Sequence, residues 1–456
     1  MTSTTHPRRT TASRGVEPMP GPGLRDLPGI VIDHVRHGEA ATDRLFERYG
    51  DVFRIGLRIL PGTTSTVLLR DPTLVRPLFT ASADEIDSTH ANKILRHLYG
   101  ERSLFLIDGH EHRRLRRILL PPLRSTALES WRETIVEVAR NSARRLPSGE
   151  PVQLHPRMLA DSLDIILRIA LGVTEEERPR WVPPMTELLE LALSPNAALQ
   201  MVLRRVLRRP PWERMQRVLG ECETLIYGEI ARRRATPDQE RHDLLALLMQ
   251  AEGEPLTDVE LRDQVMTMLI AGHETSATAV SWAIERLLRH PEALARATEE
   301  ARSGDSDAYA EAVMLEALRL RPPIAVVGRV TRGTFQLGEW ELPPGTLVSP
   351  FIRGIHESAA LYNDPKAFRP ERFLDATPPP YTLVPFGGGL HRCLGDRLAV
   401  FQSKLFLQTY LQEVDLEPAS RSDEKIKRKA IAYVPGDGAR VGVRHHVGTD
   451  ARTIRA

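Results

Sequence analysis

The sequence predicts a mainly α-helical fold with a smaller β part, folded as a single large domain. Three observations support this prediction. Apolar residues recur with helical periodicity through most of residues 72–320. Within that region, residues 257–290 contain no proline and correspond to a helix of about 50 Å, roughly the width of the whole molecule, which must cross the core. Short strand patterns occur near both ends of the chain, so both ends are expected to contribute to the β part.

The N-terminal part of the chain contains a leader and two strands. Residues 1–24 are rich in Thr, Arg, Pro and Gly and lack the apolar stretch of a signal peptide, so we interpret them as a disordered leader. Residues 52–57 and 65–70 have strand patterns on either side of a Pro-Gly turn, and we expect a strand in each.

Helices dominate the middle of the chain, and short strands return after residue 320. The periodicity predicts helices over residues 125–146, 157–172, 211–235 and 257–290. The last of these starts with a capping-box pattern, Thr257-x-x-Glu260, and stops before Pro291. Strands are expected at 326–332, 334–337 and 346–350, and a final helix follows Cys393.

The composition excludes several classes of protein. The 456 residues are 41% apolar and 27% charged with a net charge of +2, which fits a globular protein and argues against general nucleic-acid binding. Only two cysteines occur, so a disulfide scaffold, a four-cysteine zinc site and a Cys-ligated iron–sulfur cluster are excluded. No segment reaches the roughly 18 consecutive apolar residues of a membrane helix, and we expect a cytoplasmic protein.

The strongest chemical signal is the run Phe386-Gly-Gly-Gly-Leu-His391-Arg392-Cys393-Leu-Gly395. Three glycines prevent helix formation and allow close approach of the backbone, and Cys393 stands where a helix is expected to begin at Leu394. Helix N-termini and neighbouring cations favour a thiolate, which serves as a nucleophile or a metal ligand. The alternative is a buried structural cysteine, an interpretation that suits Cys222 between two glutamates.

A second signal lies midway along the predicted long helix, in the run Ala271-Gly272-His273-Glu274-Thr275-Ser276. A carboxylate in such an apolar stretch is costly unless it has a partner or a function. Gly272 leaves room for a flat group against the helix, and the Thr275 hydroxyl can bond to a carbonyl one turn earlier. The alternative is a Glu on a solvated face beside a buried Thr.

The run that ends at Gly395 resembles the haem-binding loop of the cytochrome P450 family, and three further motifs follow that family's order over roughly residues 25–445. The resemblance implies one catalytic domain over 25–445, a tail over 446–456, and haem b between the long central helix and the helix after the cysteine loop. It implies that the Cys393 thiolate is the axial iron ligand. It also places four residues against the cofactor: Ala271, Phe386, Gly387 and Gly395.

The resemblance assigns further roles to polar residues. Thr275 would position peroxide and water, and Glu274 would relay protons during oxygen activation. Cations for the two haem propionates would come from His112, Arg116, Arg329 and His391. Taken alone, residues 110–117 are a basic surface helix, and Arg113 and Arg117 are candidates to meet an acidic redox protein.

A structural triad and a substrate pocket complete the implied site. Glu316 and Arg319, which alone would be a surface ion pair, join Arg372 in a buried network that retains haem. The implied pocket is lined by Thr267, Ile270, Ala271, Ala325, Val326, Ile431 and Ala432, with a lid from residues 84–100 and 190–205. Ordinary core packing is the alternative for each lining residue. The arginines of the lid region are interpreted as solvated surface: Arg204, Arg205, Arg208 and Arg209.

These inferences predict a monomeric haem-thiolate monooxygenase of secondary metabolism. It would hydroxylate or epoxidise a small lipophilic substrate (terpenoid, polyketide, steroid or fatty-acid-like) with O2 and electrons from a ferredoxin and its ferredoxin reductase. One alternative is a peroxide-driven or rearranging haem enzyme, which needs no relay such as Glu274 and Thr275. Another is a non-catalytic haem sensor or carrier, which would normally need an output domain.

Overall fold

The structure is a computed structural model that describes residues 18–192, 212–238, 240–374, 377–429 and 431–447. Several predicted features therefore lie outside the described residues. These are most of the leader (1–17), most of the tail (448–456), and the lid residues 193–205 together with Arg208 and Arg209.

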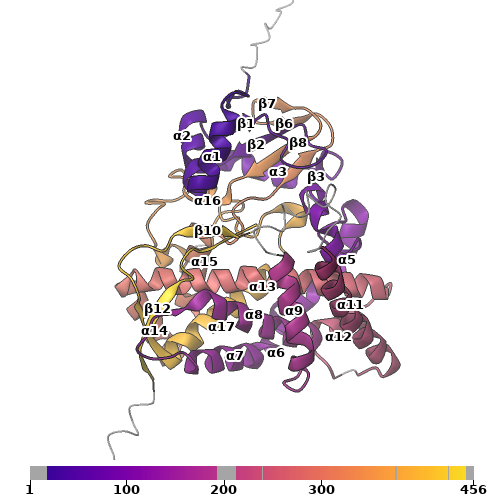
Figure 1. Cartoon of the computed structure of the whole chain (residues 1–456), viewed down its shortest axis with the longest axis vertical. Helices are drawn as coiled ribbons and strands as arrows, with labels where there is room; N and C mark the ends of the chain where they lie inside the picture. Colours follow the sequence, from indigo (N-terminus) through magenta and orange to yellow (C-terminus); the bar gives the residue numbers. More distant parts are fainter. Residues whose placement is uncertain (1–17, 193–211, 239, 375–376, 430, 448–456) are drawn as a thin grey trace, which may run out of the picture.

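The helices form the larger part of the molecule, and the helix α13 (Asp258–Leu288) runs across its full width (Figure 1). This confirms the prediction of one long helix that crosses the core. In the part of the chain that the structure describes, no helix has both the length and the apolar character needed to cross a membrane. The other helices are α1 Leu27–His37, α2 Glu39–Tyr49, α3 Val75–Thr80, α4 Arg96–Tyr99, α5 Gly109–Leu119, α6 Ser125–Ser130, α7 Arg132–Arg144, α8 Leu154–Leu171, α9 Arg178–Ala192, α11 Trp212–Ala235, α12 Leu244–Met249, α14 Pro291–Ser303, α15 Ala308–Leu320, α16 Ile352–His356 and α17 Asp396–Glu413.

Helix α13 starts with the predicted capping box. The Thr257 hydroxyl accepts the backbone N–H of Glu260 at 3.2 Å, and the Glu260 carboxylate accepts the backbone N–H of Thr257 at 2.9 Å. These two bonds satisfy donors that a helix start leaves free. The local sequence therefore fixes where the long helix begins.

The predicted single helix over 125–146 was wrong, because the chain breaks at Trp131 into α6 and α7. The Ser130 hydroxyl donates to the Ala127 carbonyl at 2.7 Å, which competes with the helical backbone bonds. The Trp131 indole N–H donates to the carbonyl of His242 at 3.1 Å and anchors the break to a distant segment.

The main sheet joins both ends of the chain, as predicted (Figure 1). Its strand order is β1-β2-β8-β5-β3, and β2 pairs in parallel with β8 in the register Ser65↔Thr346. Its strands are β1 Val52–Ile55, β2 Ser65–Leu69, β3 Ile86–Asp87, β5 Arg329–Thr331 and β8 Thr346–Pro350.

In the described ranges, three smaller sheets accompany the main one. The hairpin β6–β7 contains a strand that was not predicted, β7, because three residues with a central Glu341 give almost no strand pattern. The hairpin β10–β11 lies against α13, where the Trp282 indole donates to the Tyr433 carbonyl at 2.9 Å. The third small sheet has the strand order β4-β12-β9. The strands of the three small sheets are β4 Val152–Gln153, β6 Phe335–Leu337, β7 Trp340–Leu342, β9 Val414–Pro418, β10 Ile426–Lys429, β11 Ala432–Pro435 and β12 Arg440–His446.

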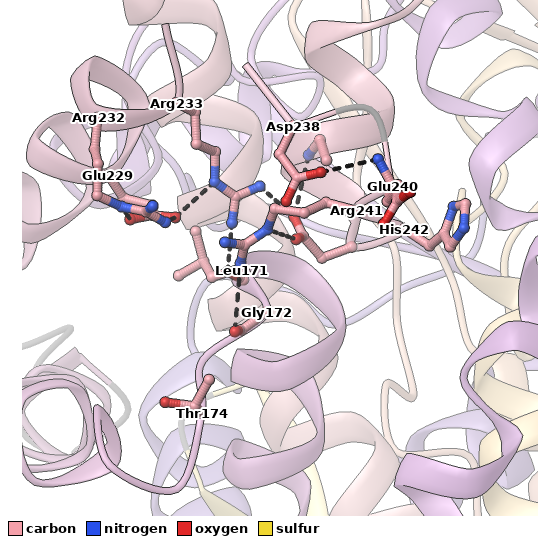
Figure 2. Close-up of polar contacts among 12 residues, drawn as sticks. Leu171, Gly172, Thr174, Glu229, Arg232, Arg233, Asp238, Glu240, Arg241 and His242 are labelled. Carbon is pink, nitrogen blue, oxygen red and sulfur yellow. Dashed lines mark hydrogen bonds and ion pairs between the residues drawn. The ribbon is translucent and has the colours of Figure 1, made fainter. Parts of the chain in front are cut away.

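A dense arginine cluster closes the C-terminal end of α8 (Figure 2). Gly172 ends the helix in a left-handed conformation, with φ +63°, which favours glycine. Arg233 and Arg241 donate to the carbonyl of Leu171 at 2.6 and 3.3 Å, so they satisfy a backbone acceptor that the helix end leaves free. We call Arg233, Arg241 and Asp243 the α8-end cluster.

Candidate functional site

Beyond its first two residues, the central helix α13 is buried on every side except along one narrow stripe. From Glu260 to Leu288 all residues are buried apart from four, which are partly accessible: Met268, Ala271, Gly272 and Thr275. Their spacing of three, four and seven positions places them on one helix face. Gly272 lies in this stripe, but a Cβ on it would lie 3.4 Å from the Ile166 side chain, so the missing side chain gives room to α8.

The cysteine loop has a geometry that only glycines allow. Gly387 and Gly389 both have φ +67°, and a Cβ on Gly389 would lie 1.8 Å from the Phe79 carbonyl oxygen. Gly387 is buried, yet a Cβ there would meet no atom within 4 Å. The loop therefore packs tightly against Phe79 on one side and leaves open space beside Gly387.

Cys393 lies at the end of this loop and is exposed, whereas Cys222 is buried. The Cys393 backbone N–H donates to the Phe386 carbonyl at 2.9 Å, which closes the loop. Helix α17 begins at Asp396, with Gly395 as its cap, so the expected start at Leu394 was wrong. Gly395 resembles Gly387, since a Cβ on it would also meet nothing within 4 Å.

Two effects act on the sulfur of Cys393 in opposite directions. Protein atoms around the sulfur desolvate it and raise the pKa of Cys393 to about 11, although the Gly395 N–H and the guanidiniums of Arg116 and Arg392 act in the opposite direction. Positive charge at the sulfur itself would favour the thiolate. A metal ion bound by the sulfur would provide that charge and displace the proton.

Four predicted cationic or hydrogen-bonding residues come together from three elements: His112 and Arg116 on α5, Arg329 on β5, and His391 in the cysteine loop. The rings of His112 and His391 stack with centroids 4.0 Å apart. Arg116 reaches the same loop and donates to the Arg392 carbonyl at 2.8 Å. The structure thus joins residues that are up to 279 positions apart in the sequence (112 to 391).

Two of these side chains, His112 and Arg329, are buried with few hydrogen-bond or ion-pair partners. His112 is 1% exposed, and among the described residues its Nδ1 has no hydrogen-bond partner. Arg329 is 7% exposed and donates to the Gly328 carbonyl at 3.0 Å, and no described carboxylate forms an ion pair with it. Burial lowers the pKa of Arg329 to about 10. Burial and the neighbouring charges of His391 and Arg116 lower the pKa of His112 to about 3.

Buried donors without acceptors are costly, so this cluster fits a ligand that brings negative charge. The two propionates of haem supply such charge, and the open space beside Gly387 and Gly395 suits a flat ring. The residues present therefore fit the predicted cofactor.

Asp108 belongs to the same cluster and was not among the predicted site residues. Its carboxylate accepts His391 Nε2 at 3.0 Å, the Gly109 N–H at 2.9 Å and Arg332 Nη2 at 3.4 Å. Burial opposes its charge, but these donors prevail and lower the pKa of Asp108 to about 2. Its position before a helix identifies it as an N-cap in the sequence, but the contact with His391 is a tertiary one that no local pattern shows.

The acid and the alcohol of α13 point in different directions. Thr275 lies in the accessible stripe, and its hydroxyl donates to the Ala271 carbonyl at 2.7 Å, as expected. Glu274 is 4% exposed and forms an ion pair with Lys429 of β10, with Nζ–Oε distances of 3.2 and 3.3 Å. Sequence reasoning missed Lys429, because it is 155 positions away and its neighbours show only an exposed strand.

The three members of the predicted triad meet in the structure. Glu316 and Arg319 are fully buried, with Arg319 Nε and Nη2 donating to the Glu316 carboxylate at 2.6 and 2.8 Å. Arg372 Nε donates to the same carboxylate at 3.2 Å. Arg319 also donates to the carbonyls of His356, Pro365 and Ala367. The network therefore ties α15 to the segment after α16.

The predicted pocket residues are distributed over three elements. On α13, Ile270 is 5% exposed, and Thr267 is 7% exposed with its hydroxyl 2.7 Å from Ser103 Oγ.

The other predicted pocket residues lie outside α13. Ala325 packs in a cluster with Phe46, Phe53 and Phe351, whereas Val326 is 37% exposed. In the turn of the β10–β11 hairpin, Ile431 is 53% exposed, and the adjacent Ala432 forms a bridge with Ile324.

Comparison with known proteins supplies an independent result. The sequence model of the family described as Cytochrome P450 matches residues 22–437. A relative from Mycobacterium tuberculosis, whose name includes cytochrome P450 135B1, is 37% identical over 95% of this chain and 92% of its own length. Two others from that organism, with names that include cytochrome P450 137 and 135A1, are each 34% identical, over 91% and 92% of this chain and 87% and 94% of their own lengths.

Proposed function

The chain belongs to the cytochrome P450 family and is a haem-thiolate monooxygenase, and from that premise we propose its substrate class, its electron donor and the roles of its residues. The proposed reaction inserts one atom of O2 into a C–H or C=C bond of a small lipophilic substrate and reduces the other atom to water. Two observations carry the proposal: Cys393 is exposed, and α13, which has the accessible stripe, packs against α17, the helix that follows the cysteine.

In this proposal the cofactor is held at three places. The sulfur of Cys393 ligates the iron, and the backbone around Phe386, Gly387 and Gly395 leaves room for the ring. His112, Arg116, Arg329 and His391 bind the propionates, which gives the buried His112 Nδ1 a partner and the buried Arg329 an opposite charge. When bound, the thiolate-ligated haem supplies the activation of O2.

The stripe of α13 is the proposed reacting face. Thr275 presents its hydroxyl there, and because that hydroxyl already donates to the Ala271 carbonyl, its lone pairs are oriented to accept a hydrogen bond from water. Glu274, one position earlier, would move protons toward that water from the other side of the helix. This acid–alcohol pair favours a monooxygenase over a peroxide-driven enzyme or a haem carrier.

The substrate is proposed to be lipophilic and of moderate size: a terpenoid, polyketide, steroid or fatty-acid-like molecule. The proposed lining residues are apolar except Thr267, and the Thr267 hydroxyl already bonds to Ser103 and to the Asp263 carbonyl, so it requires no polar group from a substrate. A role in secondary metabolism within the cytoplasm fits such a substrate.

The electron donor is proposed to be a separate ferredoxin with its ferredoxin reductase. Arg113 and Arg117 are exposed on α5, the helix that carries the cofactor-binding His112 and Arg116, so an acidic partner docked there would lie near the cofactor. We propose that residues 25–445 form one monomeric catalytic domain.

Two measurements test this proposal. Cys393→Ser should abolish the red-shifted absorption of the reduced carbon monoxide adduct, while Cys222→Ala, a change at the buried cysteine, should preserve it. A screen of terpenoids, polyketides, steroids and fatty acids should find compounds that change the spin state of the iron. An unchanged spectrum in Cys393→Ser would contradict the assignment of Cys393 as the iron ligand. Spin-state changes confined to polar compounds would contradict the proposed lipophilic substrate class.

A further inference from the structure

The acid of the proposed relay is tied to the hairpin β10–β11 through Lys429. Among the described residues, Lys429 is the one cation within ion-pair distance of Glu274. Glu274 has 5% of its side chain exposed and Lys429 has 32%, so the carboxylate is buried while its lysine partner reaches solvent. A buried carboxylate that lost this partner would be left without compensation.

Two histidines near this ion pair do not replace the lysine as a cation. His155 on α8 and His273 on α13 are close enough for Lys429 to influence both, and each is buried. Burial, with the positive charge of Lys429 as a further cause, lowers the pKa of His155 and of His273 to about 4, so both imidazoles are neutral at physiological pH. His155 bonds to Thr278 Oγ1 at 3.1 Å and His273 to the Leu159 carbonyl at 2.9 Å. Lys429 is therefore the charge that balances Glu274.

The hairpin that carries Lys429 is also the one that carries proposed substrate contacts. Lys429 pairs directly with Ala432 in the β10–β11 register. Strand β11 is fastened to the core by the bond from the Trp282 indole and by the bond from the Tyr433 N–H to the Pro323 carbonyl, at 2.8 Å. The position of the lysine is thus set by a strand that is fixed to α13 itself.

We propose that Lys429 is a positioning residue of the proton path: it holds Glu274 toward the surface at hairpin β10–β11, where the carboxylate takes up protons that it then passes toward Thr275. This inference rests on the proposed function and adds the point at which protons enter. A solvent proton binds the carboxylate, moves on to water held at Thr275, and leaves the carboxylate ionised and paired with Lys429 again. No electron transfer is involved.

The test compares three holoenzyme variants: Lys429→Met, Lys429→Arg and Lys427→Met. Lys427 lies on the same strand and is exposed, so Lys427→Met applies the same chemical change without touching Glu274. The rate of NADPH oxidation is measured in H2O and in D2O with a surrogate ferredoxin and reductase and no added substrate. Lys429→Met should slow the reaction and raise the solvent isotope effect at least about twofold, because a carboxylate no longer held toward the surface exchanges protons with solvent more slowly. Losing general acid–base catalysis entirely would cost about 10² or more in rate.

A second readout does not depend on turnover. The thermal unfolding midpoints of Lys429→Met, Glu274→Gln and the double variant form a cycle, and contact between the two residues predicts that the two single effects do not add. The carbon monoxide spectrum of each variant reports haem-thiolate ligation separately, so loss of the proposed function as a whole is distinguishable from loss of this role.

Two results support the inference together: Lys429→Arg restores the isotope effect, and Lys427→Met behaves as the unaltered protein. An isotope effect in Lys429→Met equal to that of the unaltered protein would overturn it. So would an equal change in Lys427→Met, since the lysine would then act only through general charge or stability.

Discussion

Two buried arginines in this protein, Arg233 and Arg329, differ in what surrounds them. In the α8-end cluster, Arg233 is 5% exposed and donates to Glu229 at 2.6 Å, to Asp243 at 2.5 Å and to the Leu171 carbonyl at 2.6 Å (Figure 2). Near the cysteine loop, Arg329 is 7% exposed, donates to one carbonyl, and has the ring of Phe79 5.3 Å away. One guanidinium is fully paired by protein, and the other is not.

The difference separates a structural arginine from a ligand-binding one. A buried guanidinium that protein carboxylates and carbonyls satisfy contributes to folding, and removing it leaves those partners unpaired. A buried guanidinium without such partners destabilises the folded protein unless a ligand brings the missing negative charge. Haem propionates bring that charge, so the two arginines should respond to mutation in opposite ways.

The largest expected effect is on stability, at the α8-end cluster. Arg233→Met should lower the free energy of unfolding by about 3–5 kcal/mol, because Asp243 and the end of α8 would lose a buried partner. Urea unfolding of the haem-loaded protein would measure it. Arg232→Met is the control: Arg232 pairs with the same Glu229 but has 53% of its side chain exposed, so its loss should cost at most about 1 kcal/mol. Equal losses in both variants would contradict the comparison.

The next effect is on cofactor binding rather than on stability. Arg329→Met should lower haem affinity by about 1.5–3 kcal/mol, or roughly 10- to 100-fold, since a charged hydrogen bond to a propionate is lost. The haem-free protein should be no less stable than the unaltered one, because no protein partner is left behind. Haem titration and urea unfolding of haem-free protein measure the two quantities. A large loss of stability in the haem-free variant would make Arg329 a structural residue like Arg233.

A smaller effect on stability is expected at Asp108. Like Glu229 and Asp243 it pairs with cationic side chains of the protein, but it lies beside the proposed ligand site. Its folded-state pKa of about 2 lies below the ordinary value of about 3.9. The stability that this shift provides is therefore present above about pH 4 and is lost as pH falls toward 2. Asp108→Asn should lower unfolding free energy near pH 7 by about 2 kcal/mol, and the difference should vanish near pH 2. A difference independent of pH would show that the carboxylate charge is not involved.

The comparison also explains what the sequence predicts well. The long helix α13 was predictable because its capping box, apolar pattern and terminal proline are all local signals. Cys393 was predictable because the glycines that its loop requires are consecutive in the sequence. The break at Trp131 was not, because it depends on a hydrogen bond to the distant His242.

The site residues that were missed share one property: their partners are distant in the chain. Asp108 meets His391 across 283 positions, and Lys429 meets Glu274 across 155. The burial that opposes a thiolate at Cys393 is hidden from the sequence for a related reason, because the desolvation that raises its pKa comes from the folded surroundings and not from its neighbours in sequence. Local sequence patterns show which residues carry charge, whereas tertiary burial and pairing determine their partners and their pKa values.

Exposed arginines form the third case, and they should show the smallest effect on stability. Arg113→Glu combined with Arg117→Glu should change the free energy of unfolding by no more than about 0.5 kcal/mol per site, since both side chains are exposed. The same double variant should raise the KM for an acidic ferredoxin, and the effect should shrink as salt is added, because exposed charges are screened beyond about 10 Å at 0.1 M. Steady-state reduction by ferredoxin at low and high salt measures it, with Arg397→Glu, an exposed arginine on α17, as a test of how wide the contact is. If KM is unchanged at low salt, α5 does not form the docking surface, and the exposed arginines of this helix serve solvation alone.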